Sequence, residues 1–193
     1  LEVSSKDLVA EYVGQTSIKT YSVIERALGG ILFIDEAYSL SSKNNSYNDE
    51  AIATLIKAME DNRDDLIVIV AGYPKEMEDF IKSNPGLKSR FQKTIHFPDY
   101  SADDLYDVFL SFCRENDYIL SEDASKYLKE KLVNYVANTT KYFGNARDMR
   151  NFLDMAISNQ ANRLLEENVT SPDALMTLIP SDLADIFEKE TAS

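Results

Sequence analysis

Residues 31–38 read Ile-Leu-Phe-Ile-Asp-Glu-Ala-Tyr, and this stretch decides the fold. Four consecutive apolar residues are typical of a strand that is covered on both faces of a parallel sheet. The strand ends in two adjacent carboxylates, Asp35 and Glu36. One carboxylate can hold a hard cation while the other accepts a proton from water, so the pair suits metal-assisted phosphoryl transfer. Taken alone, the stretch is more often a plain strand before an acidic helix start.

The surrounding sequence predicts two units. Strand patterns at residues 1–4, 31–35, 66–71 and 93–97 alternate with helical spacing at 16–28, near 52–59 and after Pro74. This alternation predicts a parallel α/β sheet in residues 1–98. After Pro98 only helical spacing appears, over residues 101–116, about 122–138, 146–167 and 181–189. Residues 99–193 are therefore predicted to form a separate helical unit.

A phosphate-binding loop is missing from this sequence. Such a loop reads G-x-x-x-x-G-K-[ST], because glycines let backbone N–H groups converge on the phosphates and Lys adds charge. None of the six glycines precedes a Lys. The sequence thus contains the second half of a nucleotide site without the first, and we interpret it as a fragment of a larger ATPase.

Composition narrows the class of protein. A net charge of −13 argues against a general nucleic-acid surface, which needs a basic face. No apolar run approaches the length of a membrane span, and no signal peptide opens the chain. The single cysteine, Cys113, is predicted to be a small core residue, and His96 a strand residue. One His and one Cys offer no metal cluster, and a cytoplasmic protein is the default expectation.

These pieces, in this order, resemble the AAA+ ATPases, in particular the branch that holds red-type RuBisCO activase, stage V sporulation protein K and the ATPases of type VII secretion. The resemblance covers almost the whole chain and is most specific at residues 11–16, 30–40, 71–73, 84–91, 97–100 and 143–147. It implies an incomplete AAA+ parallel sheet followed by an all-helical lid subdomain. It also implies ATP and Mg²⁺ as cofactors and a hexameric ring as the working assembly.

The resemblance assigns roles to three charged residues of the α/β part. Asp35 and Glu36 match the Walker B pair, in which Asp35 would orient Mg²⁺ through its water shell and Glu36 would polarise the attacking water. Arg90 matches the arginine finger, which would stabilise charge on the γ-phosphate in the neighbouring subunit's site. A planar, permanent cation suits that task. The alternative for Arg90 is a surface residue that precedes a strand.

Two further matches concern nucleotide sensing. Arg147 matches the sensor-2 arginine at the start of a lid helix, whereas Arg150 is expected to be interfacial or structural. Tyr73 occupies the sensor-1 position, where the family usually has Asn or another small polar residue. A phenol there can hydrogen-bond water or phosphate, and packing under Pro74 is an equal explanation.

The stretch Tyr12-Val13-Gly14 matches the pore loop, in which an aromatic and an aliphatic residue grip a polypeptide in the channel of the ring. Tyr supplies broad contact area and Gly lets the loop bend. A core Tyr at a helix end is the rival explanation. The polar neighbours Glu11 and Gln15 favour the pore role.

The main departure from the family is the absence of its first strand, which lies between the strands matched here by 66–71 and 93–97. We expect a gap in the sheet there, and no ATP hydrolysis by these residues alone. The favoured function is a motor that remodels or threads a protein substrate. The alternatives are a non-catalytic interaction or scaffold module and a loader that acts on nucleic acid, which acidity disfavours.

Overall fold

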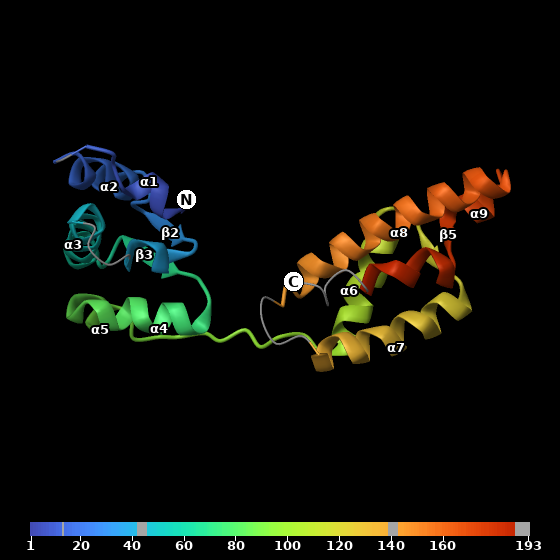
Figure 1. Cartoon of the computed structure of the whole chain (residues 1–193). Coiled ribbons are helices and arrows are strands. Elements are labelled where there is room, and N and C mark those ends of the chain that lie inside the picture. The colour runs from blue at the N-terminus through green and yellow to red at the C-terminus, as the bar shows by residue number, and fades with distance from the viewer. Residues whose placement is uncertain (13, 42–45, 139–142, 188–193) are drawn as a thin grey trace. The chain divides into compact units, whose positions relative to one another are not determined.

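The computed structural model describes residues 1–12, 14–41, 46–138 and 143–187. The chain divides into two compact units, Leu1–His96 and Phe97–Ser193 (Figure 1). Each unit has its own cluster of buried apolar side chains. The two units are therefore described separately.

The first unit is an α/β layer structure whose elements alternate along the chain. They are β1 (Glu2–Val3), α1 (Ser5–Leu8), α2 (Thr16–Glu25), β2 (Gly30–Ile34), the 3-10 helix η1 (Ala37–Ser41), α3 (Ser46–Asp61), β3 (Leu66–Val70), α4 (Pro74–Ser83) and α5 (Pro85–Arg90). The three strands are parallel and lie in the order β1-β2-β3. The predicted fold class, a parallel sheet followed by a helical lid subdomain, is confirmed.

The two faces of this small sheet differ. Leu32 and Ile34 of β2 are fully buried in the core. On the opposite face, Ile67 and Ile69 of β3 are 59% and 42% exposed. Parallel sheets normally have both faces covered, so this face is unusually apolar for a surface.

The predicted strand at residues 93–97 is wrong. Residues 91–100 contain no helix or strand, and Ile95 and Phe97 are 68% and 84% exposed. His96 accordingly is not a strand residue. The alternating pattern of residues 93–97 gives them strand propensity, but no neighbouring strand in the described part of the chain is available to pair with them. An isolated strand is not stable in water. Among the described residues β3 pairs only with β2, so no strand is paired with its other edge.

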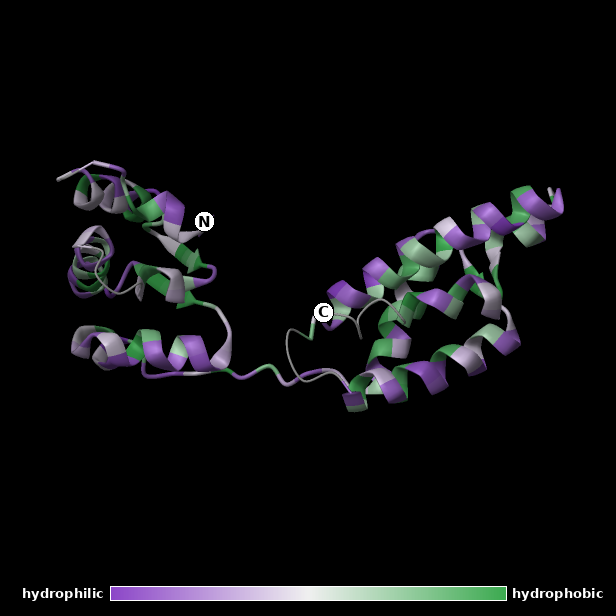
Figure 2. Cartoon of the chain, in the orientation of Figure 1, coloured by the Kyte–Doolittle hydropathy of each residue, from purple (hydrophilic) through white to green (hydrophobic). Residues whose placement is uncertain are grey.

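The second unit is mainly helical. Its elements are α6 (Ala102–Glu115), β4 (Ile119–Leu120), α7 (Glu122–Asn138), α8 (Ala146–Glu167), α9 (Pro172–Met176), β5 (Thr177–Leu178) and the 3-10 helix η2 (Pro180–Phe187). Polar and apolar residues alternate around α7 and α8, as expected of helices with one buried face (Figure 2). The two-residue parallel pair β4–β5 has no counterpart in the sequence prediction, which found only helices here. Cys113 is a core residue, as predicted.

Buried polar groups of the helical unit are paired. The Arg163 guanidinium donates to both carboxylate oxygens of Asp182, at 2.8 and 3.0 Å, and Asp182 is only 1% exposed. Gln160 Nε2 donates to the backbone carbonyls of Ala174, Leu175 and Thr177. These bonds fix the C-terminal elements onto α8. In the part of the chain that the structure describes, no helix is long and apolar enough to cross a membrane.

Candidate functional site

Asp35 and Glu36 lie directly after β2, the central strand of the sheet, and both side chains are exposed. The strand directs them there because the ladder continues one residue further, with the Asp35 N–H donating to the Val3 carbonyl at 3.0 Å. The carboxyl ends of parallel strands meet at one edge of a sheet, which is where ligands bind in open α/β folds. Both acids therefore occupy the expected edge.

The turn that carries Glu36 is strained. Glu36 has a φ of +48°, in a region that residues with a side chain seldom adopt. Three bonds hold the turn: Asp35 Oδ1 accepts the Glu36 N–H at 2.9 Å, the Ala37 N–H donates to the Ala71 carbonyl at 3.0 Å, and the Ser39 hydroxyl donates to the Glu36 carbonyl at 2.7 Å. Strain that is maintained by surrounding bonds in this way is characteristic of functional sites.

Two tyrosines stand beside this turn. The rings of Tyr38 and Tyr73 lie 6.3 Å apart between centroids, and Tyr73 follows the end of β3 and is 51% exposed. Partial burial, followed by a side-chain hydrogen bond with Glu36, raises the pKa of Tyr38. Gly72 permits this approach, because a Cβ there would lie 2.7 Å from the Tyr38 ring. Tyr73 thus shares this edge with Tyr38, and its sensor-1 role stays a prediction.

The residues present fit a magnesium ion. Asp35 uses one carboxylate oxygen for the Glu36 N–H, no described residue bonds the other, and the Glu36 carboxylate lies next in the chain. Mg²⁺ keeps several waters and is bound through one or two carboxylates, so a full cage of protein ligands is not required. The described residues contain no group of three or more His, Cys, Asp or Glu that forms such a cage.

Arg90 ends helix α5 and is held within its own unit. Its Nη2 donates to Glu60 Oε2 of α3 at 2.8 Å, and its side chain is 25% exposed. Arg90 Nε is buried and has no hydrogen-bond partner among the described residues. The guanidinium thus makes one ion pair with Glu60 and one hydrogen bond from Nη1 to Ser89 Oγ at 3.2 Å, while Nε has no acceptor in the described residues. It does not precede a strand, since residues 93–97 form none.

Arg147 belongs to the helical unit, where it is exposed in the first turn of α8. Arg150, one turn later, places its guanidinium carbon 4.5 Å from the centre of the Phe112 ring. This cation–π contact gives Arg150 a structural role in the unit. Arg147 and Arg150 thus have different surroundings, and the sensor-2 role of Arg147 stays a prediction.

The Tyr12 loop, residues 9–15, has an anchored base and an exposed tip. Lys19 Nζ donates to the carbonyls of Lys6 and Val9 at 2.6 and 2.8 Å, and Thr16 Oγ1 accepts the Ala10 N–H at 3.1 Å. Tyr12 itself is 67% exposed, so it is not a core residue of this unit. Gly14 has a φ of +77°, which glycine adopts readily. Val13, the middle residue of the predicted pore loop, lies outside the described residues.

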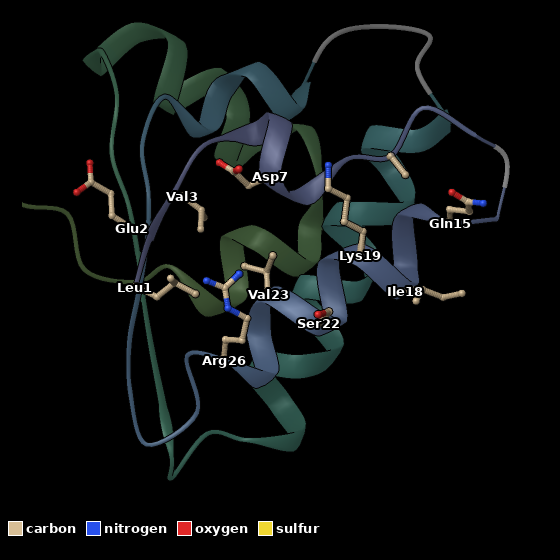
Figure 3. A pocket seen from close by; sticks show the side chains of 11 residues that line it. Leu1, Glu2, Val3, Asp7, Gln15, Ile18, Lys19, Ser22, Val23 and Arg26 are labelled. Atoms are coloured by element: carbon tan, nitrogen blue, oxygen red, sulfur yellow. The ribbon is translucent and has the colours of Figure 1, made fainter.

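A cavity of the α/β unit lies elsewhere. It measures about 740 Å³ and is lined by residues in and around β1, α1 and α2, among them Glu2, Val3, Lys19, Val23 and Arg26 (Figure 3). None of the residues predicted to bind nucleotide lines it. We therefore place the candidate site at the edge formed by Asp35, Glu36, Tyr38 and Tyr73.

Sequence reasoning missed three residues of these sites. Tyr38 could have been found, since it stands two residues after Glu36 in the stretch quoted first. Glu60 is 30 residues from Arg90, and no local pattern indicates their pairing. Asn145 belongs to the motif at residues 143–147, but the motif does not indicate that its side chain bonds Asp99 and Tyr100.

Comparisons with known proteins agree in both units. The family described as "ATPase family associated with various cellular activities (AAA)" matches residues 1–99, and the AAA lid domain matches residues 101–193. Stage V sporulation protein K of Bacillus subtilis (strain 168) is 43% identical over 186 residues, which are 95% of this chain and 58% of that protein.

Two further relatives are similar to the same extent. Protein CbbX of Cereibacter sphaeroides is 42% identical over 187 residues, 95% of this chain and 60% of that protein. A CfxQ homolog of Galdieria sulphuraria is also 42% identical over 187 residues, 95% and 61% of the two chains. This chain thus spans about three-fifths of the length of the curated relatives that it matches.

Solved structures share the fold at low sequence identity. The FIGL-1 AAA domain aligns with a TM-score of 0.67 at 16% identity, over 97% of this chain and 61% of that one. A structure described under "Structural Basis for Katanin Self-Assembly" aligns with a TM-score of 0.59 at 17% identity, over 97% and 61%. At such identity these likenesses bear on fold alone.

Proposed function

Because this chain belongs to the AAA family of ATPases, we propose that it is part of an ATP-driven ring motor that remodels or threads a protein substrate. It spans about three-fifths of its relatives, so the activity is proposed for the whole protein that contains it. One observation carries the proposal. Two adjacent carboxylates leave the carboxyl end of the central strand, and the second stands on a strained turn.

The chemistry follows from the surroundings of each side chain. Asp35 would hold Mg²⁺, and the ion would supply charge neutralisation on the phosphates when bound. Glu36 accepts the proton of the attacking water. Tyr38, whose pKa is raised, stays protonated and orients the Glu36 carboxylate by a hydrogen bond. The exposed hydroxyl of Tyr73 contacts water or phosphate at the same edge.

The central test replaces Glu36 by Gln in the longest natural protein that includes these residues. We expect ATP hydrolysis to fall by at least about a hundredfold, because a general base is lost, while ATP stays bound in assembled rings. Glu25→Gln, an exposed change on α2, is the matched control. Hydrolysis that survives Glu36→Gln would refute the catalytic role and favour an interaction module.

These residues alone are proposed to be inactive. No glycine in the sequence is followed by Lys, so no phosphate-binding loop is present to hold the triphosphate. We expect no measurable turnover and weak nucleotide binding, if any, from the 193-residue chain. Turnover comparable with that of the whole protein would contradict this expectation.

Arg90 is proposed to act in the site of a neighbouring subunit, which requires a ring, hexameric as in the family. Its support is a guanidinium whose Nε has no partner in the described residues and whose single ion pair is to an exposed carboxylate that a phosphate can replace, beside one hydrogen bond to Ser89. Mixing Arg90→Ala subunits with Glu36→Gln subunits tests this, because some mixed interfaces combine an intact Glu36 with an intact Arg90. We expect two inactive proteins to regain hydrolysis when mixed. No recovery on mixing would exclude action between subunits.

Tyr12 is proposed to grip the polypeptide substrate. Its support is an exposed aromatic side chain on a loop whose base is anchored by Lys19 and Thr16. In the whole protein, Tyr12→Ala should abolish the stimulation of ATP hydrolysis by an unstructured test polypeptide. Tyr21→Ala, which also removes an exposed Tyr, should leave that stimulation in place. Equal effects of the two changes would count against a pore role.

A further inference from the structure

The start of helix α8 contains a strained asparagine. Asn145 precedes the helix with φ +52° and ψ −122°, a combination that residues with side chains rarely adopt. An asparagine at this position usually bonds the free N–H groups of its own helix. Asn145 does not make that bond. Its side chain is used elsewhere, and strain retained at one residue calls for a functional explanation.

The Asn145 side chain binds the segment that connects the two units. Its Oδ1 accepts the Tyr100 N–H at 2.8 Å, and its Nδ2 donates to Asp99 Oδ1 at 2.8 Å and to the Phe143 carbonyl at 3.3 Å. Asp99 and Tyr100 are 45 or more residues away in sequence. They directly precede α6, whose first turn is closed by Ser101 and Asp104. Both the oxygen and the nitrogen of the amide are thus used to hold the connection.

The residues beside Asn145 keep this arrangement in place. Asp148 is buried, and its Oδ2 accepts the Gly144 N–H and the Tyr135 hydroxyl, each at 2.7 Å. A Cβ at Gly144 would lie 2.0 Å from Asp148 Oδ1, so only glycine fits. The Arg147 N–H donates to the Gly144 carbonyl at 2.9 Å. The turn that precedes Arg147 is therefore bonded to α8 and α7 through Asp148, and to the connecting segment through Asn145.

We propose that Asn145 is a positioning residue: it joins Asp99 and Tyr100 to the first turn of α8, and so sets where Arg147 meets the nucleotide. This inference rests on the proposed nucleotide-binding role of Arg147. It locates the bending part of the connection before Asp99, in the exposed residues 92–98, because Asp99 and Tyr100 are bonded to the start of α8. Bending in residues 92–98 then leaves the turn before Arg147 unchanged.

The contact of Asn145 with Tyr100 can be tested in the 193-residue chain. Asn145→Ala should speed the hydrogen exchange of the Tyr100 amide by about tenfold or more, because its acceptor is lost. Asn168→Ala is the matched control, since Asn168 has a similar φ of +54° at the other end of α8 and makes no such contact. Unchanged Tyr100 exchange in Asn145→Ala would overturn the proposal.

Exchanging the amide and the carboxylate between positions 145 and 99 distinguishes loss of this contact from a general loss of folding. Asn145→Asp sets two carboxylates against each other and should also speed Tyr100 exchange. Asn145→Asp combined with Asp99→Asn restores one donor and one acceptor with the polarity reversed, and should return Tyr100 exchange to near its original rate. Failure of the double variant to recover, with the helical unit still folded, would show that the pairing is not what protects Tyr100.

Nucleotide binding is measured in the whole protein with a fluorescent ATP analogue. Asn145→Ala and Arg147→Ala should each weaken binding by about five- to tenfold, and the double variant should be no weaker than Arg147→Ala alone. If the double variant instead lost affinity by the product of the two single losses, Asn145 would not act through Arg147, and the proposal would be overturned. An unchanged affinity in Arg147→Ala would instead refute the role proposed for Arg147, and the nucleotide part of this inference with it, whatever Tyr100 exchange shows.

Discussion

The two units of this chain differ in what they leave unpaired. The α/β unit leaves apolar side chains such as Ile67 and Ile69 on an uncovered sheet face, with nothing paired to the free edge of β3 in the described residues. The helical unit also exposes apolar side chains, such as Val133 and Leu165, but its buried Asp182 and Gln160 find hydrogen-bond partners within the unit. The sheet, in contrast, presents an apolar face and a free strand edge of the kind that other protein normally covers.

The largest expected effect tests this contrast with one truncation in each unit. Phe109 of α6 is fully buried, so Phe109→Ala should lower the free energy of unfolding of the helical unit by about 3–5 kcal/mol. Ile67→Ala, at a side chain that is 59% exposed, should cost less than about 1 kcal/mol and reduce the binding of a hydrophobic dye. Denaturant titrations followed by hydrogen exchange of each unit measure both. A large loss at Ile67 would mean that the face is already covered.

The next effect concerns the buried ion pair of the helical unit. Asp182→Ala removes the main acceptor of Arg163 and the acceptor of the Ile179 N–H, which leaves a mostly buried cation with only the longer contact to the exposed Glu167 at 3.4 Å. We expect a loss of about 2–4 kcal/mol, since breaking one side of a buried pair is strongly destabilising. Thermal unfolding of the helical unit measures the loss. Arg163 and Asp182 replaced together by Met and Leu should recover part of it, and no recovery would argue against this account.

A smaller effect depends on pH and on the single thiol. Burial raises the pKa of Cys113 from 9.0 to about 11, and nearby Arg114 opposes this weakly. The unfolded chain therefore loses the thiol proton first as the pH rises. The contribution of the protonated thiol to the free energy of unfolding is fully present below pH 9 and is lost between pH 9 and pH 11, by on the order of 2–3 kcal/mol. The free energy of unfolding of Cys113→Ala should depend less on pH over this range, because the variant lacks the thiol and keeps the other titrating groups.

The elements and the acidic edge of the sheet could be predicted because their signals are local. An apolar run followed by Asp35 and Glu36 specifies a strand and its end, and the position of parallel strand ends follows from the fold. The strand at residues 93–97 failed because pairing depends on a neighbour that the pattern does not contain. The two-residue pair β4–β5 is too short to leave a pattern.

The contacts of the candidate site were less predictable than its location. Glu60 and Arg90, or Asn145 and Asp99, are brought together by tertiary structure across 30 and 46 residues. No periodicity records such pairs. The strain at Glu36 and Asn145 is likewise invisible in sequence, since both residue types are common in ordinary turns and helices. Tyr38 is the exception, because its distance from Glu36 is set by the turn itself.

The smallest expected effect completes the contrast between the units. The Arg90–Glu60 pair, unlike Arg163–Asp182, has an acid whose side chain is 63% exposed. Glu60→Gln should therefore change the free energy of unfolding by no more than about 0.5 kcal/mol, because exposed ion pairs are weak. Such a weak partner can be exchanged for phosphate at little cost, as an arginine finger requires. If Glu60→Gln were to cost as much as Asp182→Ala, Arg90 would be a structural residue, and its proposed action in a neighbouring subunit would lose its physical basis.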